Sequence, residues 1–357
     1  MVGGKVPHEP PPHSEQVEFL VNIQRLLDEG GFVATYKYAL LHALADLALI
    51  KGDDTGAALV LSTRDIAEKF IELYWKQVKP FKLHGKHELV ILKQNTGKQA
   101  AVINRLMEAH ETSGMSMAKF RRDSKAWRKL VGKVDQTVKV MPLWKLQTVG
   151  RETSEFLYKN TGKGKSITLF PGVAYCFRKF YNMLISMIRG SWVAYIRRFN
   201  LKELGQVTDL SSFLFGSERA PISVYRDLLM DIQRGSCFYC RGNLKKEDVE
   251  VDHFVPWSKY PVDLGHNFVL AHKKCNLAKS DSLAGEGHLE RWCLRNIDYK
   301  EDLVSRFESK EVVHDLGNTN AITHWAYAQT EGVGGYVWIT GKEFRQLSTS
   351  WRHWISD

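Results

Sequence analysis

Two pairs of candidate metal ligands with the same spacing constrain this chain more than any other feature. Cys237 and Cys240 are separated by two residues, and His272 and Cys275 repeat that gap further along. Thiolates and an imidazole with this spacing converge on a tetrahedral Zn²⁺ from tight turns. Because the four side chains fill every coordination position, we predict a structural zinc and not a reactive one.

The segment between the two pairs has a readable order of elements. Residues 249–256 (VEVDHFVP) alternate and are rich in β-branched side chains, which predicts a strand. A loop follows at 258–265, then a second strand at 266–271 (HNFVLA), and the run from 275 (CNLAKSD) is expected to begin a helix. The predicted order is strand, loop, strand and helix, with one ligand pair at each end.

This arrangement resembles the HNH endonuclease family, also called the ββα-metal nucleases. The residues that carry the resemblance are Asp252-His253 on the first strand, Asn267 at the second and Asn276 at the helix. It spans about residues 224–295 and is of the HNN type, because asparagine is the last residue of the motif.

The resemblance implies a zinc-stabilised ββα-metal domain that hydrolyses phosphodiester bonds. It implies that Asn267 is a scaffold residue that fixes the loop and orients His253. Zinc-containing members commonly use four cysteines, so His272 is a departure, and one that zinc tolerates.

Phosphodiester hydrolysis needs a base to activate water and a cation to stabilise the developing charge. His253 suits the base because imidazole titrates near neutral pH. Asp252 and Asn276 offer hard oxygen ligands for one Mg²⁺ or Mn²⁺. Lys279 follows Asn276 by three residues, on the same helix face, and we expect it to contact phosphate.

The adjacency of Asp252 and His253 poses a geometric difficulty. Neighbours on a regular strand point to opposite faces, so the strand must twist, bulge or end there, and Pro256 favours an early end. His266 lies near enough to supplement the site, although a structural role is the better interpretation.

Charge indicates a polyanionic partner. The net charge is +10, and the basic excess lies ahead of residue 281, which suits nucleic acid or an acidic membrane surface. Residues 119–145 are the most basic stretch, and their tryptophans, Trp127 and Trp144, are expected to pack inward. We predict that nucleic acid contacts Arg121, Arg122, Lys125, Arg128 and Lys129 in this stretch.

The fold class is predicted to be α+β, with a mainly helical N-terminal region ahead of the zinc-stabilised domain. A helix from about residue 34 to 50 is apolar nearly all round and should be central. His42 and Asp46 on it suit a core hydrogen bond better than a metal or catalytic pair. The loop at 51–56 and the capped helix after it fit a plain bundle better than a helix-turn-helix variant.

We expect five segments: a disordered tail (1–13), a helical domain (14–112), a basic middle region with a linker near 204–220 (113–218), the nuclease domain (219–296) and a helical, aromatic cover (297–357).

The five cysteines are too few for a disulfide scaffold, and three of them have metal-ligand spacing, which favours a reducing compartment. The first residues, MVGGKVPHEPPPH, lack the apolar run of a signal peptide. The most apolar later stretch, residues 181–196, is interrupted by Arg189 and is too short for a membrane span. We expect a cytoplasmic protein without membrane contact.

DNA is the expected partner, and bacterial restriction or anti-phage defence is the setting that the resemblance suggests. A regulatory protein partner is a further hypothesis, because a free nuclease is hazardous to a cell. Two alternatives stay open: a zinc-stabilised DNA-binding protein without catalysis, and a nuclease that acts on RNA or branched junctions. The sequence does not predict the oligomeric state.

Overall fold

The chain folds into two compact units, Met1–Gly216 and Ser217–Asp357. The structure is a computed structural model that describes residues 9–82, 89–113, 116–149, 152–160, 164–204, 209–216 and 222–355. Long helices and short strand pairs make it an α+β protein, which confirms the predicted class. Residues 14–112 and 113–216, which lie in regions expected to be separate, belong to the first unit.

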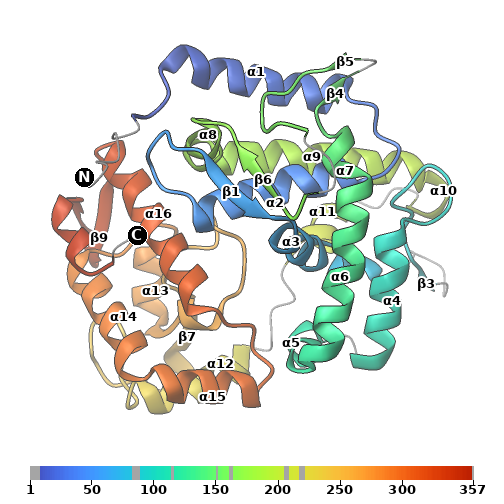
Figure 1. Cartoon of the computed structure of the whole chain (residues 1–357). Helices are drawn as coiled ribbons and strands as arrows, with labels where there is room; N and C mark the ends of the chain where they lie inside the picture. The colour runs from blue at the N-terminus through green and yellow to red at the C-terminus, as the bar shows by residue number, and fades with distance from the viewer. Residues whose placement is uncertain are drawn as a thin grey trace, which may run out of the picture. The chain divides into compact units, whose positions relative to one another are not determined.

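The N-terminal unit is mainly helical (Figure 1). Its helices are α1 (His13–Glu29), α2 (Tyr36–Lys51), α3 (Thr63–Trp75), η1 (Lys76–Val78), α4 (Ala101–Ser113), α5 (Met117–Arg122), α6 (Ser124–Val140), α7 (Pro142–Lys145), α8 (Val173–Lys179), α9 (Tyr181–Phe199), α10 (Leu201–Leu204) and α11 (Leu210–Phe215). Its antiparallel strand pairs are β1 (Leu59–Ser62) with β6 (Ser166–Leu169), β2 (Phe81–Lys82) with β3 (Leu89–Val90), and β4 (Thr148–Val149) with β5 (Glu152–Thr153).

Helix α2 forms the centre of this unit. It is buried from Tyr36 to Leu49, as its apolar pattern predicts, and α3, α8 and α9 pack around it. The Ser62 hydroxyl caps α3 by accepting the Arg64 backbone N–H at 3.1 Å. Helices α4 and α6 run side by side next to this core (Figure 1).

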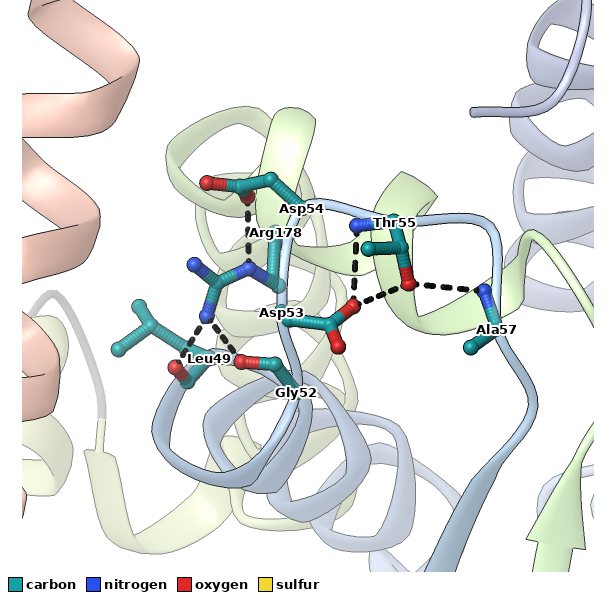
Figure 2. Close-up of polar contacts among 7 residues, drawn as sticks. All are labelled: Leu49, Gly52, Asp53, Asp54, Thr55, Ala57 and Arg178. Atoms are coloured by element: carbon teal, nitrogen blue, oxygen red, sulfur yellow. Dashed lines mark hydrogen bonds and ion pairs between the residues drawn. The ribbon is translucent and has the colours of Figure 1, made fainter. Parts of the chain in front are cut away.

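A buried arginine closes the C-terminal end of α2 (Figure 2). Arg178 of α8 donates through Nη1 to the carbonyl oxygens of Leu49 and Gly52, at 2.6 and 2.8 Å. Its Nε donates to Asp54 at 2.9 Å. Carbonyls at a helix end have no partner within the helix, so this guanidinium satisfies them while its charge is balanced by Asp54.

His42 and Asp46 lie together in the same core. His42 Nδ1 is 3.5 Å from Asp46 Oδ1, which also accepts the Tyr181 hydroxyl at 2.6 Å. Arg189 donates to the other ring nitrogen of His42 at 3.1 Å. Each residue is thus held in the core by a hydrogen bond to a third residue, whereas His42 Nδ1 makes no hydrogen bond to Asp46.

Two expectations for chain ends and linkers need correction. Residues 1–8 of the expected tail lie outside the described residues, but Pro11 is buried and α1 already begins at His13. Within the linker expected at 204–220, residues 210–215 form α11, with Leu210 and Leu214 almost fully buried. The polar composition of this segment predicted a linker, but its two buried leucines pack against the core and order it as a helix. Residues 205–208 and 217–221 lie outside the described residues.

The C-terminal unit surrounds one hairpin with helices. Its elements are α12 (Ile222–Ile232), η2 (Lys246–Asp248), β7 (Val249–His253), η3 (Gly265–Asn267), β8 (Phe268–His272), α13 (Lys273–Lys279), α14 (Glu286–Asp298), α15 (Lys300–Ser309), α16 (Leu316–Gly332), β9 (Tyr336–Thr340), β10 (Glu343–Gln346) and η4 (Thr349–His353). Strands β7 and β8 are antiparallel, with Val249 opposite His272 and His253 opposite Phe268. Strands β9 and β10 form a second antiparallel pair.

Both α12 and α13 pack against the β7–β8 hairpin. Phe268 and Leu270 of β8 join a buried cluster with α12 and α15, including Leu229 and Phe307. Trp292 of α14 stacks on Phe254 at 5.1 Å, just after β7. Burial of this much apolar and aromatic surface gives the hairpin the rigid surroundings that an isolated two-stranded ribbon lacks. Among the described residues, no helix has the length and apolar character needed to cross a membrane.

Candidate functional site

The four predicted zinc ligands meet in the structure. The ligand atoms of Cys237, Cys240, His272 and Cys275 all lie within 4.8 Å of one another. Cys240 Sγ is 3.2 Å from His272 Nδ1. Two donors come from the turn that precedes β7, one from the end of β8 and one from the first turn of α13. Three sulfurs and one imidazole nitrogen at these separations suit tetrahedral zinc.

The surroundings of the cluster orient its ligands. His272 Nε2 lies 3.0 Å from the Asn243 carbonyl oxygen, so Nε2 donates there and Nδ1 faces the sulfurs. A Cβ on Gly242 would lie 3.2 Å from His272 Cε1 and 3.5 Å from Cys240 Sγ. A side chain at this position would require the His272 ring to shift by a few tenths of an ångström. The ligand spacing did not reveal Asn243 and Gly242, because their role depends on how the turn folds.

The pKa values of two thiols in the cluster are shifted in opposite directions. Burial raises the pKa of Cys275 to about 12, and the nearby charge of Cys237 adds to that effect. Burial also raises the pKa of Cys240, but hydrogen bonds outweigh it, first from the Gly242 backbone and then from the other three ligands, and bring the pKa to about 7. Because the sulfurs repel one another as thiolates, full ionisation of the cluster calls for a metal ion.

Asp252 is buried and already paired. Its Oδ2 accepts the Tyr239 hydroxyl at 2.5 Å and lies 3.0 Å from Lys279 Nζ. Lys279 is fully buried and also donates to the His253 carbonyl oxygen at 3.0 Å. Burial lowers the pKa of Lys279, and Asp252 acts against that shift.

The structure therefore does not support the predicted phosphate contact of Lys279. The expectation that Lys279 and Asn276 share a face of α13 is correct, but that face is directed at β7 and not at solvent. A buried ammonium with two protein partners braces the end of β7 and leaves no route to a phosphate.

Asn276 engages the same strand at a different residue. Its Nδ2 donates to Glu250 Oε2 at 2.8 Å, one turn of α13 away from the pair formed by Lys279 and Asp252. Glu250 and Asp252 alternate along β7, so both side chains point toward α13. The structure thus brings Asp252 and Asn276 to one face of the hairpin and adds Glu250, which was not among the predicted site residues.

His253 is the last residue of β7. The strand therefore ends at the position where the neighbouring side chains of Asp252 and His253 must leave the regular alternation to reach one site. Its Nε2 lies 2.8 Å from Asp263 Oδ1, and the two side chains are 19% and 13% exposed. The ring packs against Phe268 and Trp257, with centroids at 4.6 and 5.5 Å. Sequence reasoning missed Asp263, because nothing in a loop residue's spacing shows which side chain it will reach.

Asn267 joins the loop after β7 to the start of β8. Its Oδ1 accepts the Val255 backbone N–H at 2.8 Å, and its Nδ2 donates to the Val255 carbonyl at 3.0 Å. Its own carbonyl accepts the Phe254 N–H at 2.7 Å. These bonds fit the scaffold role implied by the family resemblance.

His266 is 1% exposed, and burial, with Arg295 as the next cause, lowers its pKa to about 3. Its carbonyl oxygen accepts Arg295 Nη2 at 2.6 Å and the Trp292 indole N–H at 3.0 Å. A neutral, buried ring of this kind fits the structural role expected for His266, and does not fit a role as an additional residue of the candidate site.

The basic residues predicted to bind nucleic acid lie on α5 and α6. Arg121 pairs with Glu72 at 2.6 Å and lies over the Trp127 ring, so the Glu72 carboxylate already neutralises its charge. Trp144 is 47% exposed, so the expectation that it packs inward is wrong. Four of the predicted side chains are exposed: Arg122, Lys125, Arg128 and Lys129.

Comparison with protein-family models gives two matches. Residues 237–284 match the model described as HNH endonuclease, which confirms the resemblance on the hairpin, the helix and the cluster. Residues 16–210 match the model described as a domain of unknown function, DUF8808. A search of curated proteins gives no match. The DUF8808 match at residues 16–210 covers more than half of the 357 residues, so the chain belongs to the DUF8808 family, and it carries an HNH endonuclease domain in its C-terminal unit.

Proposed function

We propose that this chain is a metal-dependent DNA endonuclease of HNH type. One observation carries the proposal: β7, β8 and α13, closed by the Cys₃His cluster, hold Asp252, His253 and Asn276 inside the region that matches the HNH endonuclease model. Phosphodiester hydrolysis needs a base and hard oxygen ligands for a cation, and these three residues supply both.

His253 is the proposed general base. It is partly exposed at the end of β7, it has a carboxylate partner, and Asn267 holds the loop that follows it. An imidazole in these surroundings can take a proton from a water molecule aligned with a phosphate.

Asp252 and Asn276 are the proposed ligands of Mg²⁺ or Mn²⁺. Tyr239 and Lys279 engage only Oδ2 of Asp252, and Asn276 uses its amide nitrogen on Glu250, so each ligand keeps an oxygen for a metal. Hard oxygen donors suit these cations. A bound cation would stabilise the charge on the phosphate and on the leaving oxygen.

The N-terminal unit supplies the proposed DNA contacts through Arg122, Lys125, Arg128 and Lys129. These exposed cations on two consecutive helices, α5 and α6, neutralise phosphates without reading sequence, so we expect binding that depends on salt. The proposed setting is bacterial restriction or anti-phage defence in a reducing cytoplasm, with activity restrained by a partner protein or by the N-terminal unit.

A second candidate is a zinc-stabilised DNA-binding protein without catalysis. The buried ion pair between Lys279 and Asp252 favours it, because an ammonium already neutralises the carboxylate that a metal would need. In this case the Cys₃His cluster and the basic helices would remain functional, and the HNH residues would only hold the fold.

Plasmid cleavage distinguishes the two candidates. Supercoiled plasmid is incubated with the full chain and Mg²⁺ or Mn²⁺, beside His253→Ala and the control His353→Ala, whose side chain is exposed elsewhere in the same unit. We expect loss of the base to slow cleavage by about 10²- to 10⁴-fold, and the control to cut at the wild-type rate. Intact plasmid with every metal, despite a gel shift, would support the second candidate. Equal cleavage by His253→Ala would remove that residue from the mechanism.

A further inference from the structure

We infer that Asp263 is a positioning residue that holds the His253 imidazole with its proton on Nε2 and presents Nδ1 as the basic nitrogen. This inference deepens the proposed nuclease function and rests on it. Its basis is the 2.8 Å contact between Asp263 Oδ1 and His253 Nε2, in a pair of which neither member is more than one-fifth exposed.

The tautomer follows from the chemistry of the two groups. A carboxylate oxygen only accepts hydrogen bonds, so at 2.8 Å the proton must be on Nε2. In the neutral ring Nδ1 then carries the lone pair, which is the state that a base needs before it takes a proton from water. When Nδ1 becomes protonated during the reaction, the carboxylate also stabilises the imidazolium.

Packing prevents the ring from turning away. Phe268, opposite His253 on β8, lies 4.6 Å from the imidazole centroid, and Trp257 lies at 5.5 Å in the following loop. A ring flip about the Cβ–Cγ bond would exchange Nε2 with Cε1, and the contact with Asp263 would be lost. The orientation is therefore held by two aromatic neighbours and one charge-assisted hydrogen bond.

The position of Asp263 is itself determined by the loop. The Asn267 N–H donates to the Leu264 carbonyl and the Gly265 N–H donates to the Val313 carbonyl, both at 2.9 Å. A Cβ on Gly265 would lie 2.9 Å from the Phe307 ring, so the backbone approaches the core closely there. The carboxylate thus comes from a segment that is fastened directly after it, as preorganisation of a base requires.

The first test measures the tautomer by nitrogen-15 NMR of the full-length, zinc-loaded chain at neutral pH. Among the 13 histidines, the His253 ring signals are identified by their loss in His253→Asn. We expect Nε2 to be protonated and Nδ1 unprotonated in the wild-type chain, and a mixture of tautomers in Asp263→Asn. A proton on Nδ1 in the wild-type chain, or identical signals in the variant, would overturn the inference.

The second test measures single-turnover cleavage by Asp263→Asn and by Asp263→Glu, which restores the carboxylate at a different reach. We expect Asp263→Asn to lower the rate about 10- to 100-fold, with unchanged DNA affinity, zinc content and Mg²⁺ requirement. We expect Asp263→Glu to recover part of that loss. The matched control is Asp298→Asn, an exposed carboxylate on α14 that should cut normally.

The outcomes separate this inference from the nuclease proposal. Normal cleavage by Asp263→Asn would overturn the inference and leave the nuclease in place. A raised Mg²⁺ requirement would make Asp263 a metal ligand and would also overturn it. If the wild-type chain cuts no DNA, the nuclease proposal fails, and the NMR measurement still decides whether Asp263 holds the ring.

Discussion

A buried ammonium is stable only when protein groups replace the water that it has lost, and Lys279 illustrates this at the scale of one residue. Its partners are the Asp252 carboxylate and the His253 carbonyl, both at 3.0 Å. Tyr239 completes the arrangement by donating to the same carboxylate oxygen. The pair contributes little net stability because both charges lost their hydration, but removal of one member leaves the other unpaired in the interior.

We predict that Lys279→Met destabilises the C-terminal unit by about 3–5 kcal/mol, since Asp252 is left buried without a counter-charge. The double variant Asp252→Asn with Lys279→Met should regain most of this loss, because no charge is then buried. Denaturant titration measures both, and Lys310→Met, at an exposed lysine, should stay within about 0.5 kcal/mol of wild type. If the double variant is no more stable than Lys279→Met, the ion pair is not the cause.

At the scale of elements, the Cys₃His cluster joins three pieces of chain at one point. Cys237 and Cys240 lie in the turn before β7, and His272 and Cys275 lie at the junction of β8 with α13. The hairpin alone is short, and α13 spans only Lys273–Lys279, so neither is stable by itself. A bound metal would supply the missing free energy and set the start of α13, where Asn276 follows Cys275 directly.

We predict that Cys275→Ser unfolds the C-terminal unit, because a structural zinc is worth on the order of 10 kcal/mol, comparable to the whole stability of a domain. Zinc content is measured by metal analysis, and folding is measured by circular dichroism. Cys293→Ser is the matched control: Cys293 is buried outside the cluster, where burial raises the pKa of its thiol to about 11, and it should keep its zinc. A folded, zinc-free Cys275→Ser chain would contradict the structural role.

At the scale of the whole molecule, the two units divide the proposed work. The C-terminal unit contains the HNH residues, and the N-terminal unit presents the exposed basic side chains of α5 and α6. Nucleic-acid affinity that comes from such side chains reflects the release of counterions, so its salt dependence measures how many phosphates they neutralise. Arg121 is not expected to contribute because Glu72 already pairs with it.

We predict that the triple variant Lys125→Gln, Arg128→Gln and Lys129→Gln weakens DNA binding and lowers the slope of log affinity against log salt by up to about 0.9 for each phosphate that is no longer neutralised. Fluorescence anisotropy with a labelled duplex at several salt concentrations measures the slope. The control removes the same charge from exposed lysines of the other unit, through Lys300→Gln, Lys310→Gln and Lys342→Gln. Equal slopes for the two triple variants would show that net charge, and not α6, governs binding.

Some features of this protein follow from local sequence because the forces involved act over a few residues. The gap between Cys237 and Cys240, repeated at His272 and Cys275, was enough to predict the cluster, since a turn of that length brings two ligands to one metal. The all-round apolar pattern of α2 was enough to place it in a core. The order of β7, β8 and α13 followed from periodicity and turn residues in the same way.

Other features were decided only by the tertiary structure. Periodicity showed which face of α13 carries Lys279, but the docking of that helix on β7 determined that the face is buried against Asp252. The approach of Asp263 to His253 depends on the path of the whole intervening loop, which side-chain packing selects and short-range propensity does not encode. Sequence by itself determined which chemical groups this site contains. Packing between distant segments determined which of these groups meet. The reason is that a contact of about 3 Å between two side chains requires every backbone angle between them to be set.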